Sequence, residues 1–232
     1  GLPFYEQAAT LARAAAEADG ESSQPAWADL AWITGNWANA LGDVGQMDPA
    51  RQRRLESTEA EKQAGMPPVN VIGSELEALR IDIQQGQVAT ALPEVEARLK
   101  QVAVWWQRHR ADQIVPEAPN AEMLARVYIA ALDIATVADF AQKNWESALR
   151  RIDAVLEVKR ALQRPAEDIA LDRMNRAVVL GRLGRFGEAR AELEACLPLF
   201  QNDPAASSTV LSSLADLFDK QGDVAQAITQ ER

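Results

Sequence analysis

A pattern of sixteen residues occurs twice in this chain and constrains its fold more than any other feature of the sequence. Residues 36–51 and 175–190 share the pattern Asn-x-Ala-x-x-Leu-Gly-x-x-Gly-x-(Met/Phe)-x-x-Ala-Arg, and the second copy begins 139 positions after the first. An internal repeat of this kind indicates a fold built by stacking copies of one structural unit. The chain is therefore expected to be a repeat array.

The centre of the pattern, a small or polar residue followed five positions later by alanine, occurs five times. The five pairs are Gly45/Ala50, Gly86/Ala91, Lys143/Ala148, Gly184/Ala189 and Gly222/Ala227. They are separated by 41, 57, 41 and 38 residues, and the longest interval indicates an insertion at 111–120. Apolar residues with helical spacing flank each pair, so each unit is predicted to be a helix, a tight turn and a second helix.

Glycine is suited to such turns because the chain leaving a helix often takes a left-handed conformation, which glycine adopts without a Cβ clash. At the third turn Lys143 stands in the place of glycine. We expect the neighbouring Asn144 to take the positive φ there, because asparagine tolerates it better than most residues.

These residues resemble the tetratricopeptide repeat (TPR) family. The last unit carries the resemblance most plainly, with Leu211, Leu214, Ala215 and Phe218 followed by Lys-Gln-Gly-Asp-Val-x-x-Ala-Ile at 220–228. The resemblance implies an all-α fold, a right-handed α-solenoid of stacked antiparallel helix pairs. The intervals of 38 to 41 residues indicate a variant of the family with long repeats.

The repeats divide the chain, taken as one TPR-like solenoid over 1–232, into six approximate units. They are 1–20, which holds a second helix only, 25–65, 70–112, 119–163, 166–202 and a truncated unit at 205–232. Natural solenoids cover their terminal apolar faces with polar capping repeats, and the sequence shows no such cap at either end. The chain is therefore expected to be an internal fragment of a larger array.

Composition argues against several classes of partner. The net charge of -10 and the pI near 4.7 argue against nucleic acid, because phosphate binding needs clustered Lys and Arg. No run approaches the roughly 20 apolar residues that cross a bilayer, and the single cysteine fits a reducing compartment. We expect a cytoplasmic protein with neither a nucleic-acid nor a membrane partner.

Residues suited to catalysis or to cofactor binding are scarce. His109 is the single histidine of the sequence, and the glycines at 42–45 and 181–184 lack the Lys-Ser/Thr and the preceding strand of a phosphate-binding loop. Cys196 stands where the family buries a small residue, so a packed thiol is expected. No catalytic residue, metal site or cofactor is predicted, and the chain is not expected to be an enzyme.

Two aromatic features are open to more than one interpretation. Trp105, Trp106 and His109 could form a binding patch, but we favour tryptophans packed on a neighbouring helix. Trp32 could pack in the core or anchor a peptide. The arginines and glutamates of 51–61 are expected to form a solvated helix face with local ion pairs.

The resemblance also implies a binding face. Ligands of the family usually lie on the concave face, on first-helix positions that stand 13, 10, 6, 3 and 2 places before each turn residue. The candidate partner-binding residues at these positions are Trp32, Asn39, Leu76, Arg80, Ile83, Asp133, Val137, Phe140, Leu171, Met174, Val178 and Arg182. The apolar members are expected to form a strip that holds a helix or an extended apolar segment, from a partner or from the protein itself.

The favoured function is a protein–protein interaction scaffold, whose concave face binds a peptide, a helix or a neighbouring domain of the same parent protein. The alternative is a sensor or regulatory array in a larger bacterial signalling or defence protein. In that case a nucleotide-hydrolysing or protease effector would lie outside this chain.

Overall fold

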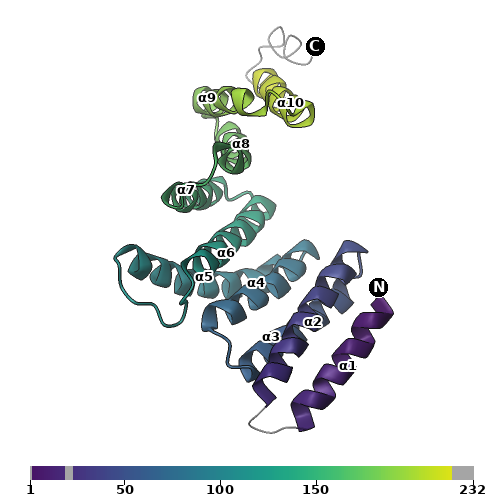
Figure 1. Ribbon diagram of the computed structural model, residues 1–232. Helices are drawn as coiled ribbons and strands as arrows, with labels where there is room; N and C mark the ends of the chain where they lie inside the picture. Colours follow the sequence, from purple (N-terminus) through teal and green to yellow (C-terminus); the bar gives the residue numbers. More distant parts are fainter. Residues whose placement is uncertain (1, 19–22, 221–232) are drawn as a thin grey trace. The chain divides into compact units, whose positions relative to one another are not determined.

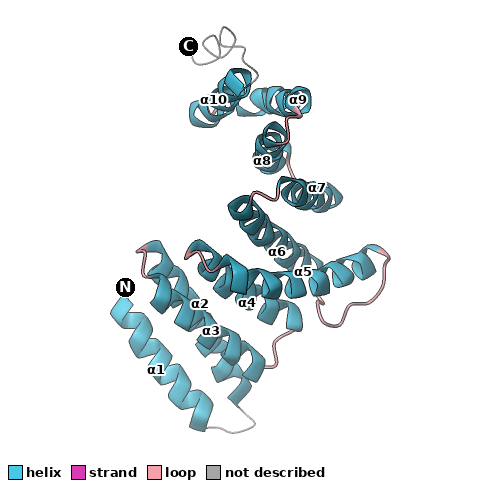
Figure 2. Ribbon diagram, turned by 180° about the vertical axis from the view of Figure 1, so that it is seen from behind, coloured by secondary structure: helices cyan, strands magenta, loops and turns pink. Residues whose placement is uncertain are grey.

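The structure is a computed structural model that describes residues 2–18 and 23–220 (Figure 1). Within these ranges the regular structure is entirely helical, as Figure 2 shows. The elements are α1 (Leu2–Ala18), α2 (Gln24–Asp43), α3 (Met47–Gln63), α4 (Pro68–Gln84), α5 (Val88–Arg110), α6 (Ala121–Gln142), α7 (Trp145–Ala161), α8 (Ala166–Arg182), α9 (Phe186–Cys196), the 3-10 helix η2 (Leu197–Phe200) and α10 (Pro204–Lys220).

Four of the predicted turns join helices as expected. Gly45, Gly86, Lys143 and Gly184 lie between α2 and α3, α4 and α5, α6 and α7, and α8 and α9. The fifth turn, Gly222 with Ala227, lies outside the described residues. The division of the chain into six repeat units stays a prediction.

Seven helices, α2 to α8, end in the same main-chain motif among the described residues. At each end one residue has a positive φ, and the amide of the next residue donates to the carbonyl five positions before it, as from Gln46 to Leu41 at 2.9 Å and from Asn144 to Asp139 at 2.8 Å. This is the Schellman arrangement, which satisfies carbonyl groups that the end of a helix leaves free.

The expectation that Asn144 takes the positive φ is wrong. Lys143 has a φ of 59° and Asn144 a φ of −84°. The position within the motif decides the conformation, because the residue before the long-range amide must be left-handed whatever its side chain. The same motif places Asp112 and Gln163 at positive φ after α5 and α7.

Small residues lie where helices approach each other closely. Ala50, Ala91, Ala148 and Ala189, each five places after a turn residue, are all buried, as are Ala38, Ala177 and Ala215 on the first helices. A larger side chain at these places would push the helices apart.

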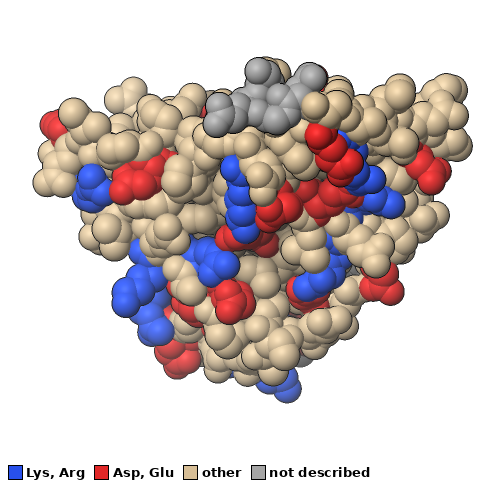
Figure 3. Space-filling view, turned by 90° about the horizontal axis from the view of Figure 1, so that it is seen from below, with Lys and Arg blue, Asp and Glu red and all other residues tan. Residues whose placement is uncertain are grey.

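Charged side chains of both signs are interspersed on the face of the molecule shown in Figure 3. Ion pairs also join neighbouring helices, for example Arg98 with Glu75 at 2.7 Å and Arg173 with Glu192 at 2.5 Å. None of the described helices has the length and apolar character required to span a membrane.

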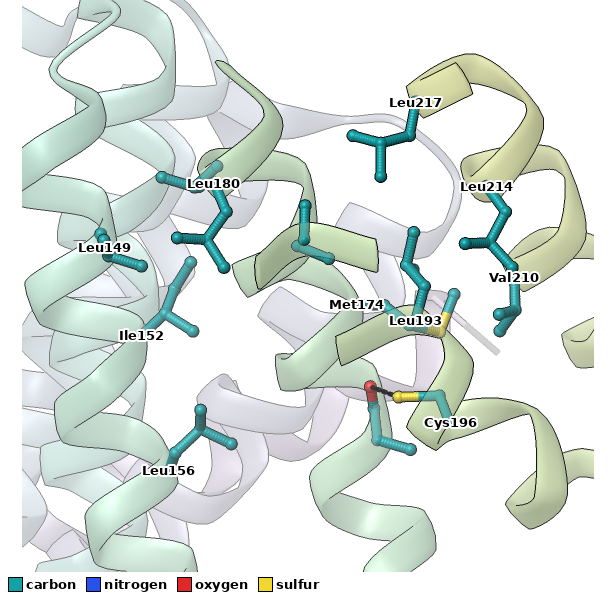
Figure 4. Close-up of a cluster of buried hydrophobic side chains, with 14 of the residues drawn as sticks. Leu149, Ile152, Leu156, Met174, Leu180, Leu193, Cys196, Val210, Leu214 and Leu217 are labelled. Atoms are coloured by element: carbon teal, nitrogen blue, oxygen red, sulfur yellow. Dashed lines mark hydrogen bonds between the residues drawn. The ribbon is translucent and has the colours of Figure 1, made fainter. Parts of the chain in front are cut away.

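The chain divides into two compact units, Gly1–Ile134 and Ala135–Arg232. In the first, Leu30, Trp37 and Leu41 of α2 pack in a core with Ala60 and Ile81. In the second, α7, α8, α9 and α10 enclose a larger core, much of which is drawn in Figure 4. Both cores lie between helices that follow one another in sequence.

The insertion at 111–120 forms the loop between α5 and α6. Val115 and Ala118 are buried, the amide of Val69 donates to the carbonyl of Glu117 at 3.0 Å, and Arg108 Nη2 donates to the carbonyl of Ile114 at 2.9 Å. The loop is therefore held against α4 and α5 by its own main chain.

Candidate functional site

An exposed row of side chains runs along the first helices at the positions 13, 6 and 2 places before the turn residue. On α2 the row is Trp32, Asn39 and Asp43, all exposed. Steps of seven and four residues return to nearly the same face of a helix, so these side chains lie on one line. Trp32 stands out because 70% of its surface is exposed, which contradicts the interpretation of this residue as core.

On the other first helices most of the equivalent positions are exposed as well. Arg80 on α4, Val137 on α6, and Leu171, Val178 and Arg182 on α8 are all exposed. All of these exposed residues except Asp43 are candidate partner-binding residues that the sequence predicted. They are accessible to a partner in the described structure.

Leu76, Ile83 and Met174 were expected to join this face, and that expectation is wrong. They are buried, with 0%, 5% and 8% of their surfaces exposed. The positions 10 and 3 places before the turn lie about 60° to 80° around the helix from the exposed row, and side chains there point into the cores. The expected continuous apolar strip is therefore interrupted.

Two candidates at the same positions differ from these three. Phe140 is half-buried, and its ring packs edge-on against Trp145 at 5.5 Å between centroids. Asp133 is exposed on α6. Phe140 therefore belongs mainly to the packing of the third turn.

A cavity of about 240 Å³ opens between α2 and α4, and α3 supplies part of its lining. We call it the α2–α4 groove. Its lining residues are Ala38, Asn39, Gly42, Asp43, Met47, Arg54, Glu77, Arg80, Ile81 and Gln84. Asn39 and Arg80 of the candidate set thus meet at one cavity, which is rich in polar and charged groups.

Arg54 reaches this groove from α3. Its Nη2 donates to Oδ1 of Asn39, while its Nε is buried and has no hydrogen-bond partner. Burial lowers the pKa of Arg54, Glu77 and Glu61 act against this by attraction, and the positive charge of Arg80 adds to the lowering. The guanidinium of Arg54 is therefore partly desolvated, and the nearby carboxylates only partly offset the effect of its burial.

The sequence interpretation of residues 51–61 is correct only in part. Arg53 does pair locally with Glu56 at 2.6 Å, and its guanidinium lies 4.0 Å from the centre of the Trp37 ring. Arg54 lies in the groove instead, and Glu61 is half-buried, so that desolvation raises its pKa. A solvated face does not describe these two residues.

A second, smaller cavity of about 60 Å³ lies between α8 and α10, and its lining combines apolar and polar residues. Val178, Leu193 and Leu217 line it together with Ala177, Gly181, Arg182, Ser213 and Asp216. Counted from the turn residues, Leu193 occupies the same place as Arg54. The two cavities are thus equivalent places in two helix pairs, and their chemistry differs at this residue.

The remaining sequence candidates serve packing. Trp105 and Trp106 are buried, and the ring of Trp106 lies 5.7 Å from that of His109 and 6.3 Å from that of Tyr128, so the packing interpretation is confirmed. Cys196 is fully buried, its Sγ donates to the carbonyl of Ala170 at 3.7 Å, and burial raises the pKa of the thiol (Figure 4). No group of three or more His, Cys, Asp or Glu that could hold a metal ion exists in the described ranges.

Stacked helix pairs with grooves between their first helices define the class: the chain has an all-α, TPR-like repeat fold, as the sequence predicted. Its structure is similar to that of BtubC (BKLC) from P. vanneervenii, with a TM-score of 0.72 and 16% identity over 99% of this chain and 86% of that one.

Two further structures are similar. One is a putative kinesin light chain from Podosopora anserina with nearly identical TPR-like repeats, with a TM-score of 0.64 and 16% identity over 85% of this chain and 89% of that one. The other is a Rap protein complexed with Competence and Sporulation Factor, with a TM-score of 0.60 and 14% identity over 88% of this chain and 52% of that one. No protein-family model and no curated protein matches the sequence.

Proposed function

We propose that this chain is a protein-interaction scaffold that binds an extended peptide along the exposed row of α2 and in the α2–α4 groove. The observation that carries the proposal is the exposed Trp32, which lies on the same helix face as Asn39 at the groove. Their separation of seven positions corresponds to about 10 Å along a helix axis. A peptide of three or four extended residues spans that distance.

An exposed tryptophan with no role in the core is a typical anchor of an interface. Tryptophan buries a large apolar area when it is covered and is enriched among the residues that dominate binding energies. The groove adds a concave, polar place for one side chain of the same ligand. The apolar anchor would supply affinity, and the polar pocket beside it would fix the position of the peptide along the helix.

Two further facts support a protein ligand. The net charge of -10 disfavours the phosphate backbone of nucleic acids. A protein of the same fold, the Rap protein, is known in complex with Competence and Sporulation Factor, so a scaffold of this kind can hold a regulatory factor.

A peptide selection tests the proposal. A random peptide library is selected on the immobilised chain, and the affinity of each enriched peptide is measured for the unaltered chain and for Trp32→Ala. We expect the substitution to weaken binding at least tenfold and to leave the melting temperature nearly unchanged, because so little of this side chain is buried.

Phe4→Ala is the matched control, because Phe4 is an aromatic residue on α1 with 75% of its surface exposed. It should leave peptide binding unchanged. A Trp32→Ala variant that unfolds more easily but binds every selected peptide as before would show that the proposed face is wrong.

A further inference from the structure

The ninth position after each turn residue distinguishes one helix pair from the other three. Val95, Ile152 and Leu193 occupy it in the later pairs and are buried apolar residues, with 0%, 5% and 2% of their surfaces exposed. Arg54 occupies it in the pair α2–α3. A charged side chain therefore stands where the fold elsewhere places part of its core.

The neighbouring helix makes room for this larger side chain. Gly35 lies ten places before its turn residue, where α4 and α8 carry Leu76 and Met174. A Cβ on Gly35 would lie 3.2 Å from Nη1 of Arg54, which is closer than ordinary van der Waals contact. The glycine and the arginine thus form a matched pair that lodges the guanidinium beside the groove.

The chain gives Arg54 no direct carboxylate partner, and the attraction of Glu77 and Glu61 does not offset the effect of its burial. Among the described residues no carboxylate lies within 4.0 Å of it, and the neutral amide of Asn39 is its one hydrogen-bond partner. Arg51 and Arg53, its neighbours on α3, each have a carboxylate partner, in Asp82 and Glu56. A desolvated cation without such a partner destabilises a fold unless an anion from outside approaches it.

We propose that Arg54, together with Asn39 and Arg80, forms a subsite for the carboxylate side chain of an Asp or Glu residue in the bound peptide. The guanidinium and amide groups donate hydrogen bonds that a carboxylate accepts, and such charge-assisted bonds are the strong ones. This inference rests on the proposed function, because it names one residue of the proposed ligand.

The lining of the groove favours a single negative charge over a double one. Asp43 and Glu77 line the same cavity as Arg54 and Arg80, and Arg80 already pairs with Glu77 at 2.8 Å. A phosphate dianion would meet both carboxylates at close range, whereas a carboxylate is smaller and carries half the charge. The cavity, of about 240 Å³, has room for one acidic side chain.

The first experiment compares selections on the unaltered chain and on Arg54→Leu, which carries the residue found at the equivalent place in α9. We expect the peptides selected on the unaltered chain to share an Asp or Glu. It should lie at a fixed spacing from the peptide residue that contacts Trp32. Replacing that acid by its amide should weaken binding at least tenfold to the unaltered chain and less than twofold to Arg54→Leu.

Arg54→Lys and Arg150→Leu are the controls. Arg54→Lys keeps the charge and should keep part of the preference for the acid. Arg150→Leu removes one positive charge from the exposed surface of α7 and should keep the full preference for the acid. Equal discrimination between acid and amide by the unaltered chain and Arg54→Leu would overturn the subsite.

The second experiment does not depend on peptide binding. The Nε–Hε signal of Arg54, assigned by its loss in Arg54→Leu, is followed by NMR during titration with N-acetyl-glutamate α-amide, N-acetyl-glutamine amide and inorganic phosphate. We expect the signal to shift with the carboxylate alone.

The outcomes separate the two proposals. If the carboxylate shifts the signal but the library yields no peptide, the subsite stands and the proposed function fails. If peptides bind through Trp32 but the carboxylate shifts nothing, the proposed function stands and the subsite is overturned. A larger shift with phosphate than with the carboxylate would also overturn it, in favour of a phosphorylated ligand.

Discussion

Lys143 is one of three residues other than glycine that have a positive φ in the described part of the chain. Its φ of 59° is the left-handed value that Gly45, Gly86 and Gly184 take at the equivalent turns. For a residue with a Cβ this conformation costs roughly 1–2 kcal/mol. We expect Lys143→Gly to raise the free energy of unfolding by about 1 kcal/mol, measured by urea denaturation.

Gly184→Ala is the complementary test. A Cβ there meets no other atom within 4 Å, so the positive φ is the sole source of strain. A loss of about 1 kcal/mol is expected. If neither variant changes the denaturation midpoint, the turn conformation does not limit stability.

The thiol of Cys196 is made less reactive by its burial, which raises its pKa. Burial raises its pKa above the usual 9.0, so the thiolate, which is the reactive form, is rarer than in an exposed cysteine. We expect a disulfide reagent at neutral pH to label the folded chain at least a hundredfold more slowly than the chain in urea. Equal labelling rates would place the thiol at the surface.

At the scale of the helix pair, the small residues of the second helix set how closely the two helices approach. Ala189 on α9 is fully buried. Enlarging it to leucine should lower the free energy of unfolding by about 1–3 kcal/mol, because the added atoms have no space. Thermal or urea denaturation measures the change.

The control for this prediction is on the same helix. Ala195 is exposed, so Ala195→Leu should change stability by less than about 0.5 kcal/mol. Similar losses for the two variants would mean that the effect comes from helix α9 as a whole and not from the contact.

Glu61 couples the packing of α3 against α4 to pH. Ser74 donates to its Oε1 at 2.7 Å, its Oε2 is buried without a partner, and desolvation raises its pKa above 4.5. A raised pKa means that the folded chain binds the proton more tightly than the unfolded chain. The stability from this group is therefore complete below pH 4.5 and is lost as the pH rises through the raised value.

Glu61→Gln removes this titration but keeps an acceptor for Ser74. Between pH 4 and pH 7 we expect the stability of the variant to rise relative to that of the unaltered chain, as measured by denaturation at each pH. Glu59→Gln, at an exposed position, is the control. Stability curves of Glu61→Gln and the unaltered chain that run parallel over this range would contradict the prediction.

The sequence was sufficient for the helices but only partly for the site. Helix periodicity and the turn residues predicted the all-helical fold and the four turns that join α2 to α3, α4 to α5, α6 to α7 and α8 to α9, because both depend on local interactions. The candidate set from the sequence contains exposed residues, such as Trp32 and Val178, but also Leu76, which turns inward, since family positions were counted without the rotation between them. Arg54 could have been found by aligning the ninth position after each turn.

At the scale of the whole molecule, the cores of the two compact units are built mainly from contacts between successive helices. In such arrays stability is close to a sum of neighbouring contacts. Leu193→Ala in the second unit should cost about 2–5 kcal/mol. We expect amide hydrogen exchange to accelerate in α8, α9 and α10 far more than in α2 and α3.

Ile81→Ala in the core of the first unit is the converse experiment. It should accelerate exchange in α2, α3 and α4 and leave α8 and α9 nearly as they were. Uniform acceleration along the chain in both variants would show one cooperative structure and not two separable cores.

The seven Schellman ends are formed by main-chain hydrogen bonds and do not use the side chains of the turn residues. Each of these joints is closed by main-chain bonds and makes one conformational demand, which glycine, lysine, aspartate and glutamine all meet here. Evolution can therefore cut, duplicate or lengthen the array at these joints without redesigning them. A groove with an unusual arginine can arise in one helix pair while the neighbouring pairs keep an ordinary core.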